Sequence, residues 1–224
     1  MPTTTHQPEV AERAETFADL HARLGGVPLD RILLHPAPGT ATLADWEARD
    51  GKRIKPICEL VEGTLVAKAT YFRDSALAVY ISVLLSVFIK PRKLGKVYGA
   101  DGPFRMLGDN VRYPDVSFVP LDRIQANPSK GQFAPSFIPA LAVEVISPSN
   151  SRAEMVKKRR EYFALGIELV WQVDADDFTV TVYTGEADAT VLRLGDTLTG
   201  GTVLPGFTTT VATIFADELP EVGS

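Results

Sequence analysis

The order of apolar segments in the second half of the chain is the feature that most constrains its fold. The segment LAVEVIS (141–147) is apolar apart from its glutamate and serine, which is typical of a central strand. A helix is predicted over about 152–165, and Gly166 closes it. Two further strands follow the helix, ELVWQVD (168–174) and FTVTVYT (178–184). This order predicts an α/β or α+β domain with a mixed sheet.

Shorter elements are predicted upstream. A polar helix is expected over 8–24, and Thr42 is placed to cap a second helix over 43–50, with Asp45 at the capping-box position. The segment 59–66 predicts a hairpin that turns at Glu62-Gly63. Two neighbouring strands, KVYGADGPFRML (96–107) and VRYPDVSFVPL (111–121), are predicted to be joined by a turn over 108–110.

A long helix is predicted from about Arg73 to Ile89, with Pro91 as its stop signal. Its apolar stretch, Leu77 to Ile89, has 13 residues. A membrane span needs about 20. We therefore expect a buried helix and no membrane partner.

Composition narrows the class of protein. Hydrophobic residues make up 45% and charged residues 23%, as in an ordinary globular protein. The net charge of −5 does not suit loose, non-specific coating of nucleic acid, so any such contact needs a local basic patch. The single cysteine excludes an intrachain disulfide and a cysteine-based zinc site. Since the N-terminus also lacks an apolar run, we expect a cytoplasmic protein.

Two acidic residues interrupt apolar strands. Asp115 lies in RYPDVSFV and Glu144 lies in LAVEVIS, each close to a strand end. A buried carboxylate is costly unless it is paired or binds a cation. One isolated acid of this kind more often points out of the sheet or meets an arginine, but two on neighbouring strands favour a site. Carboxylate oxygens are the ligands that Mg²⁺ prefers.

Basic residues lie on the predicted helix that follows Glu144. At 100° per residue, Lys158 and Arg159 fall within the apolar arc, and Lys157 and Arg160 fall opposite. One of Lys158 and Arg159 is therefore expected to point toward the sheet, although a stem with a solvated head is equally compatible. Periodicity does not choose between them. The residues that define the arc are Met155, Tyr162 and Phe163.

Three segments carry a resemblance to a known family. They are PDVSFV, VEVISPSNSRAEMVKKRREYFALGIELVWQVD and GDTLTGGTVLPGF. Over about residues 42–217 the chain resembles the bacterial Uma-type endonucleases of the PD-(D/E)XK, restriction-endonuclease-like superfamily, most specifically over 143–174. The resemblance implies a restriction-endonuclease-like α/β core with a central mixed sheet flanked by helices. It leaves an N-terminal extension with a helix over 1–41 and an acidic tail over 218–224.

The resemblance also implies roles for individual residues. Asp115, in the Pro-Asp motif, and Glu144 would be the ligands of Mg²⁺ or Mn²⁺. The usual superfamily lysine, two residues after the second acid, is replaced here by Ile146, and the matching residue in the following helix is Lys158. Glu59 matches an N-terminal acid that assists the metal.

The chain departs from the family pattern at two places. Cys58 stands where the family often has tyrosine, just before Glu59. The long helix commonly begins near a histidine, whereas this chain has Arg73-Asp74.

The implied reaction is hydrolysis of DNA. The metal would polarise a phosphodiester oxygen and activate a water. Lys158 would orient that water or stabilise charge on phosphorus, and the pKa of an ammonium can fall in such a site. Two basic patches, 90–96 and 152–162, are candidate DNA contacts, although the first is more often a solvated face. The DNA-binding candidates are Lys90, Arg92, Lys93, Lys96 and Arg159.

Other polar clusters are predicted to be structural. VDADD (173–177) is typical of a polar turn, and the serines around Pro148 are expected to turn the chain and cap a helix. No histidine pair has metal-ligand spacing, and no GxxxxGK or GxGxxG motif occurs.

The sequence thus predicts a divalent-metal-dependent endonuclease that acts on DNA. A catalytically idle module that keeps the nuclease fold for DNA binding or assembly is the alternative, and hydrolysis of another phosphate ester is a third. Because restriction-like nucleases often pair to cut two strands, and because the helix over 77–89 is apolar, we also expect a homodimer.

Overall fold

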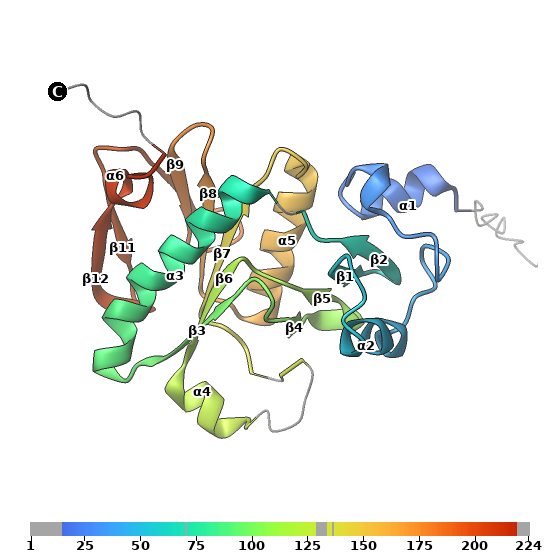
Figure 1. Cartoon of the computed structure of the whole chain (residues 1–224), viewed down its shortest axis with the longest axis horizontal. Helices are drawn as coiled ribbons and strands as arrows, with labels where there is room; N and C mark the ends of the chain where they lie inside the picture. Colours follow the sequence, from blue (N-terminus) through green and yellow to red (C-terminus); the bar gives the residue numbers. More distant parts are fainter. Residues whose placement is uncertain (1–14, 70, 129–133, 136, 219–224) are drawn as a thin grey trace, which may run out of the picture.

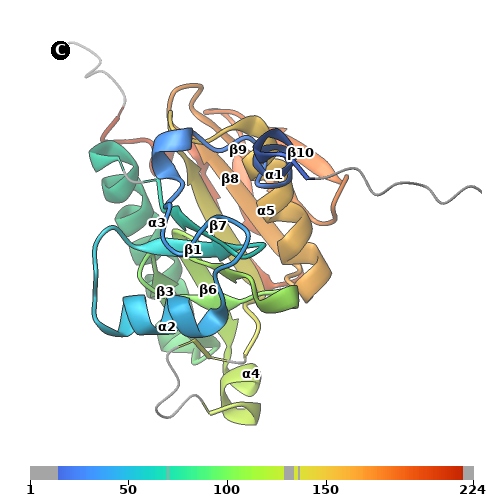
Figure 2. The same ribbon diagram turned by 90° about the vertical axis from the view of Figure 1, so that its right-hand side faces the viewer.

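A six-stranded mixed sheet forms the centre of the protein. The computed structural model describes residues 15–69, 71–128, 134–135 and 137–218. In the sheet the strands run in the order β10-β9-β8-β7-β6-β3 (Figures 1 and 2), and only β7 and β8 are parallel to each other. The predicted mixed sheet is therefore confirmed. The strands are β3 (Gly95–Gly99), β6 (Val116–Pro120), β7 (Leu141–Ile146), β8 (Leu169–Asp174), β9 (Thr179–Tyr183) and β10 (Ala189–Leu192).

Helix α5 (Arg152–Leu165) makes the crossover between the parallel strands β7 and β8. The Ser151 hydroxyl accepts a hydrogen bond from the Glu154 N–H at 2.9 Å and caps the helix. Gly166 ends it with a φ of 100°, a backbone conformation that suits glycine. The bounds predicted for this helix are confirmed.

Helices cover both faces of the sheet (Figure 2). Helix α3 (Phe72–Arg92) packs Leu77, Ile81 and Leu85 on one face, and Tyr162 of α5 lies in a second core on the other face. The two-stranded sheet of β11 (Thr197–Gly200) and β12 (Leu204–Thr210), with α6 (Val211–Ile214), joins the core on the α3 side.

Helix α3 differs from its prediction in two respects. It has 21 residues and continues past Pro91 to Arg92, because a proline in the last turn removes one hydrogen bond and Lys93, with a φ of 54°, makes the actual stop. The expected buried helix is buried on one face only, since Val79, Val83 and Val87 are exposed. By length and composition α3 could cross a membrane, and within the described residues 33% of its apolar window is buried in the protein.

A smaller sheet, in the order β2-β1-β5-β4, lies beside the large one. Its hairpin turns at Glu62 and Gly63, with φ values of 46° and 70°, as predicted. The strands predicted over 96–107 and 111–121 are neighbours, but each breaks in two: β3 pairs with β6 in the large sheet and β4 pairs with β5 in the small one. The strands are β1 (Cys58–Val61), β2 (Thr64–Ala67), β4 (Phe104–Arg105) and β5 (Val111–Arg112).

The N-terminal segment packs on the small sheet. Leu20, Leu24 and Ile32 share a core with Val61 and Val66 of the hairpin. Within the described residues the first helix begins only at residue 17, and the rest of its predicted range, 8–14, lies outside them. The remaining helices are α1 (Phe17–Arg23), α2 (Leu43–Gly51) and α4 (Leu121–Ala126), with short 3-10 turns at Leu29–Arg31 and Leu107–Asp109. The capping box predicted for α2 is present.

Candidate functional site

Folding places Asp115 just before β6, beside the neighbouring strand β7 that carries Glu144. Val116 of β6 pairs with Val143 of β7 in antiparallel register, so the next pair along is Asp115 with Glu144. The carboxylate of Asp115 accepts a hydrogen bond from the Val145 N–H at 2.8 Å. Strands β6 and β7 are neighbours, as predicted, but Asp115 lies just before β6 instead of within it. That the two carboxylates share one ion stays a prediction.

The two carboxylates turn toward different partners. Glu144 points toward α5, where its oxygens accept hydrogen bonds from Lys158 Nζ at 3.1 Å and from the Tyr162 hydroxyl. Asp115 precedes β6 at a bend, and its carboxylate lines a pocket beside the first turn of α3. Among the described residues, the two carboxylates therefore share no hydrogen-bonding partner.

Lys158 is the basic residue of α5 that points toward the sheet. Its ammonium lies 3.1 Å from Glu144 Oε2 and 3.1 Å from Glu59 Oε1, and it is almost fully buried. Arg159 instead stacks over Tyr183, 4.2 Å from the ring centroid. Helical periodicity does not distinguish Lys158 from Arg159, and the structure shows that Lys158 is the one that points toward the sheet.

Glu59 anchors the other side of Lys158. Its carboxylate accepts a hydrogen bond from Arg112 Nη1 at 2.7 Å and from the Tyr113 N–H at 3.3 Å. Arg112 also pairs with Glu161 of α5 at 2.6 Å. Burial alone would raise the pKa of Glu59, but the charges of Lys158 and Arg112 outweigh it and lower the pKa to about 2.

These charges fix the protonation of the buried pair. Burial raises the pKa of Glu144, and the nearby carboxylates of Asp115 and Glu59 oppose the stabilising charge of Lys158. For Lys158, burial favours the neutral amine, but Glu144 and Glu59 outweigh it and raise the pKa. The suggestion that the pKa of this lysine can fall is therefore wrong here, and the ammonium stays charged.

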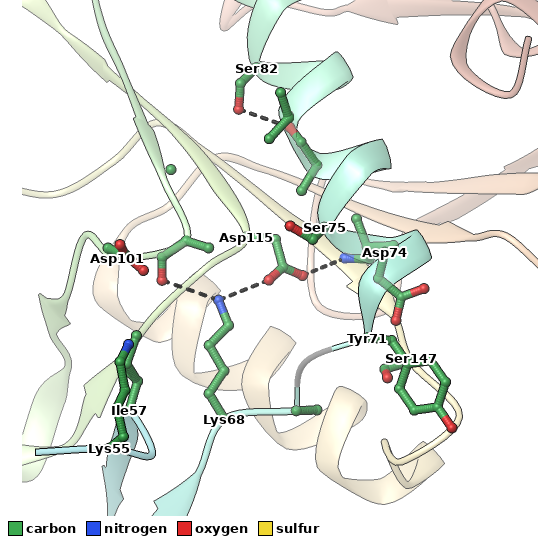
Figure 3. A pocket seen from close by; sticks show the side chains of 16 residues that line it. Lys55, Ile57, Lys68, Tyr71, Asp74, Ser75, Ser82, Asp101, Asp115 and Ser147 are labelled. Carbon is green, nitrogen blue, oxygen red and sulfur yellow. Dashed lines mark hydrogen bonds and ion pairs between the residues drawn. The ribbon is translucent and has the colours of Figure 1, made fainter. Parts of the chain in front are cut away.

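Lys68, which sequence reasoning missed, neutralises Asp115. It follows β2, and its ammonium lies 2.8 Å from Asp115 Oδ1 (Figure 3). It also donates to the carbonyl oxygens of Tyr113 at 2.9 Å and Ala100 at 3.3 Å. No sequence spacing signals this contact, because only the packing of the two sheets brings the end of β2 to Asp115.

The pocket beside Asp115 has a volume of about 310 Å³. Asp74, in the first turn of α3, and Ser147, just after β7, stand on its wall with Asp115 (Figure 3). The two carboxylate oxygens of Asp74 and the Ser147 Oγ atom are all buried. None of these three atoms has a partner in hydrogen-bonding geometry. Burial raises the pKa of Asp74, and the nearby Ser147 hydroxyl opposes that rise. Sequence reasoning missed Asp74 as a site residue, since an acid in the first turn of a helix is common.

The predicted DNA contacts lie elsewhere. Lys90, Arg92 and Lys93 are at the C-terminal end of α3, about 24 Å along the helix from Asp74 at 1.5 Å per residue. Arg92 stacks on Phe88 of the same helix, 4.1 Å from the ring centroid. The structure does not bring these residues, Lys96 or Arg159 to the pocket that Asp115 lines.

The clusters predicted to be structural behave as expected where they are described. The carboxylate of Asp174 accepts hydrogen bonds from the N–H groups of Asp176 and Asp177, which closes the polar turn. His21 hydrogen-bonds to the Val27 carbonyl at 2.7 Å, and His6 lies outside the described residues. Across the described part of the chain, no group of three or more His, Cys, Asp and Glu side chains is arranged to hold a metal ion.

Comparisons with known proteins give a family and a similar fold. A family model described as "Uma2: Putative restriction endonuclease" matches residues 42–212. A crystal structure described as a "putative nuclease belonging to DUF820" from Anabaena variabilis has a similar fold, with a TM-score of 0.67 and 20% sequence identity over 80% of this chain and 99% of that chain. No curated protein matches the chain.

Proposed function

We propose that this chain, which belongs to the Uma2 family of restriction-endonuclease-like proteins, is a divalent-metal-dependent endonuclease that hydrolyses DNA phosphodiester bonds. One observation supports the proposal: Asp115 directly precedes β6, next to Glu144 of the neighbouring strand β7, and the Lys158 ammonium lies 3.1 Å from Glu144. Two carboxylates with an adjacent ammonium are the groups that a phosphoryl-transfer site needs.

The donor set fits a hard divalent cation. Asp115 is partly exposed to the pocket, and the unpartnered oxygens of Asp74 and Ser147 stand nearby, so every free donor is an oxygen. Glu144 accepts one hydrogen bond on each carboxylate oxygen, and an ionised carboxylate can accept more. We propose Asp115 and Glu144 as ligands of Mg²⁺ or Mn²⁺. The bound ion would supply polarisation of a phosphodiester oxygen and a lower pKa for the attacking water.

Lys158 would act on this site through its ion pair with Glu144. It does not line the pocket, and its ammonium is fixed between Glu144 and Glu59. Glu144 does not line the pocket either, so Lys158 holds the Glu144 carboxylate in place and would act on the phosphate through its charge alone. Proton acceptance by Lys158 is disfavoured, because the two carboxylates keep it charged.

The proposed substrate is DNA, and the contacts outside the pocket belong to the same proposal. Lys90, Arg92, Lys93 and Lys96 would contact the DNA backbone beyond the α3 end of the fold, and Arg159 would do so from α5. The proposed homodimer is supported by the exposed row of Val79, Val83 and Val87 along α3.

The alternative function, an idle nuclease-fold module, is favoured by a different observation. Three acids of the site already have a cation: Asp115 pairs with Lys68, Glu144 with Lys158, and Glu59 with Arg112. A site that is neutralised internally in this way can be stable without metal. In this alternative, the protein would use its nuclease fold for DNA binding or assembly, without cleavage.

Incubation with plasmid and with single-stranded DNA distinguishes the two functions. We expect cleavage in Mg²⁺ or Mn²⁺, none in EDTA, and recovery when metal is restored. DNA binding without cleavage over the whole range of Mg²⁺ and Mn²⁺ concentrations would support the idle module and contradict the proposal.

A further inference from the structure

Asp74 is a buried carboxylate without a hydrogen-bonding partner. Its exposed fraction is 7%, and neither of its oxygens has a donor in hydrogen-bonding geometry. Two nearby cations are engaged elsewhere, since Arg73 pairs with Asp176 and Lys68 pairs with Asp115. A buried and unpaired negative charge is costly, so the position calls for a cation.

The first turn of α3 does not by itself satisfy this carboxylate. An acid at this position commonly caps the helix by accepting a hydrogen bond from the N-cap residue. Here the N-cap residue is Tyr71, and no side-chain capping bond is made. Asp74 instead stands on the wall of the pocket, where Figure 3 shows no interaction joining it to Lys68 or Asp115.

A second observation points to a ligand at the same place. The Ser147 hydroxyl is 4% exposed, lies close enough to Asp74 to influence its pKa, and has no partner in hydrogen-bonding geometry. Asp74, Ser147 and Asp115 line one pocket of about 310 Å³, which has room for an ion and its waters. Carboxylate and hydroxyl oxygens with several waters match the coordination that Mg²⁺ and Mn²⁺ prefer.

We infer that a divalent cation binds on the α3 side of Asp115, held by Asp74 and Asp115 with the Ser147 hydroxyl nearby. This cation position is separate from Glu144, which faces α5. The inference deepens the proposed function, on which it rests for its role in cleavage, but the binding itself can be measured without DNA. Lys68 competes for the position, because its ammonium lies 2.8 Å from Asp115 Oδ1.

Titration of the metal-free full-length protein with Mn²⁺ tests the inference, with calorimetry for binding and thermal unfolding for stability. In Asp74→Asn the number of bound Mn²⁺ ions should fall by one, or the affinity should fall at least about tenfold. Without metal this variant should be at least as stable as the parent, because an uncompensated buried charge is removed. Asp176→Asn is the matched control: it removes the same charge from an exposed neighbour and should stay within about twofold of the parent.

Lys68→Met provides a test that poor folding cannot mimic. It keeps an unbranched apolar stem and removes the competing charge, so Mn²⁺ should bind more tightly than in the parent. Unchanged Mn²⁺ binding in Asp74→Asn, no tightening in Lys68→Met, or no binding by the parent would each overturn the inference.

The same titration separates this inference from the proposed function. Binding that depends on Asp74, in a protein that cleaves no DNA, would support the cation position and contradict the nuclease proposal. Metal-dependent cleavage, together with Mn²⁺ binding that is unchanged in Asp74→Asn, would support the nuclease proposal and contradict the cation position.

Discussion

Lys158 shows how one side chain can link three elements at the residue scale. Its ammonium joins Glu59 of β1 to Glu144 of β7 from a position on α5. Two carboxylates around one buried cation keep that cation charged. The residue therefore acts through its charge and through the position of Glu144.

Lys158→Ala should lower both stability and cleavage. Two buried carboxylates would lose their shared cation, which costs about 3–5 kcal/mol when a buried pair is broken. Single-turnover cleavage should fall by about 10²-fold or more, as it does when a positioned group is lost from a site. Circular dichroism first establishes that the variant is folded at the assay temperature.

Two neighbouring residues are the matched controls for Lys158. Lys157→Ala removes a partly buried ammonium that pairs with Glu62 and Glu161, and cleavage should stay within a few-fold of the parent. Arg159→Ala should mainly weaken DNA binding, in a salt-dependent way. A folded Lys158→Ala protein that cleaves like the parent would refute the assignment.

At the scale of elements, α5 was predictable because its signals are local. Ser151 and Gly166 mark its ends, and the apolar strands on either side mark the crossover. That Asp115 and Glu144 come from neighbouring parts of the sheet was also predictable, since each acid interrupts an apolar segment. Lys68 and Asp74 were not, because the end of β2 and the first turn of α3 meet Asp115 only through packing. Lys158 and Arg159 could not be separated, since both fall within one arc of the helix.

Ser151→Ala should loosen the helix that carries Lys158. It removes the hydrogen bond to the Glu154 N–H and a second bond to the Gly25 carbonyl. The free energy of unfolding should fall by about 0.5–2 kcal/mol, the usual effect of losing an N-cap. Ser149→Ala is the control and should have a smaller effect. Urea denaturation measures both, and equal losses would show that the cap does not stabilise α5.

At the scale of the whole molecule, one buried ion pair ties the N-terminal segment to the domain. Arg31 and Glu154 form a bidentate pair at 2.9 and 2.8 Å, and Arg31 also donates to the carbonyl oxygens of Ala67 and Ser149. Burial raises the pKa of Glu154, but the hydrogen bonds from Arg31 and the charge of Lys158 outweigh it and the pKa is lowered. The pair therefore stabilises the fold only where Glu154 is ionised.

The pH dependence of stability follows from this pair. Because the pKa of Glu154 is lower in the folded state, its contribution is present above the unfolded pKa of about 4.3 and is lost as the pH falls below it. Arg31→Met should lower the stability at pH 7 by about 3–5 kcal/mol, since Glu154 is left buried and unpaired. It should also flatten the acid decline, as shown by urea denaturation at several pH values. An acid decline as steep as the parent's would contradict this role.

Cleavage by Asp115→Asn tests the central proposal most directly. The change removes one charge and almost no volume from a proposed metal ligand that lines the pocket. Single-turnover rates on plasmid DNA in Mg²⁺ should fall by about 10²-fold or more relative to the parent. DNA binding should stay close to that of Asp176→Asn, a control that loses an exposed charge. Because Lys68 loses its ion-pair partner, circular dichroism first establishes that the variant is folded at the assay temperature. A folded Asp115→Asn protein that cleaves DNA at the parent's rate would contradict the proposed active site.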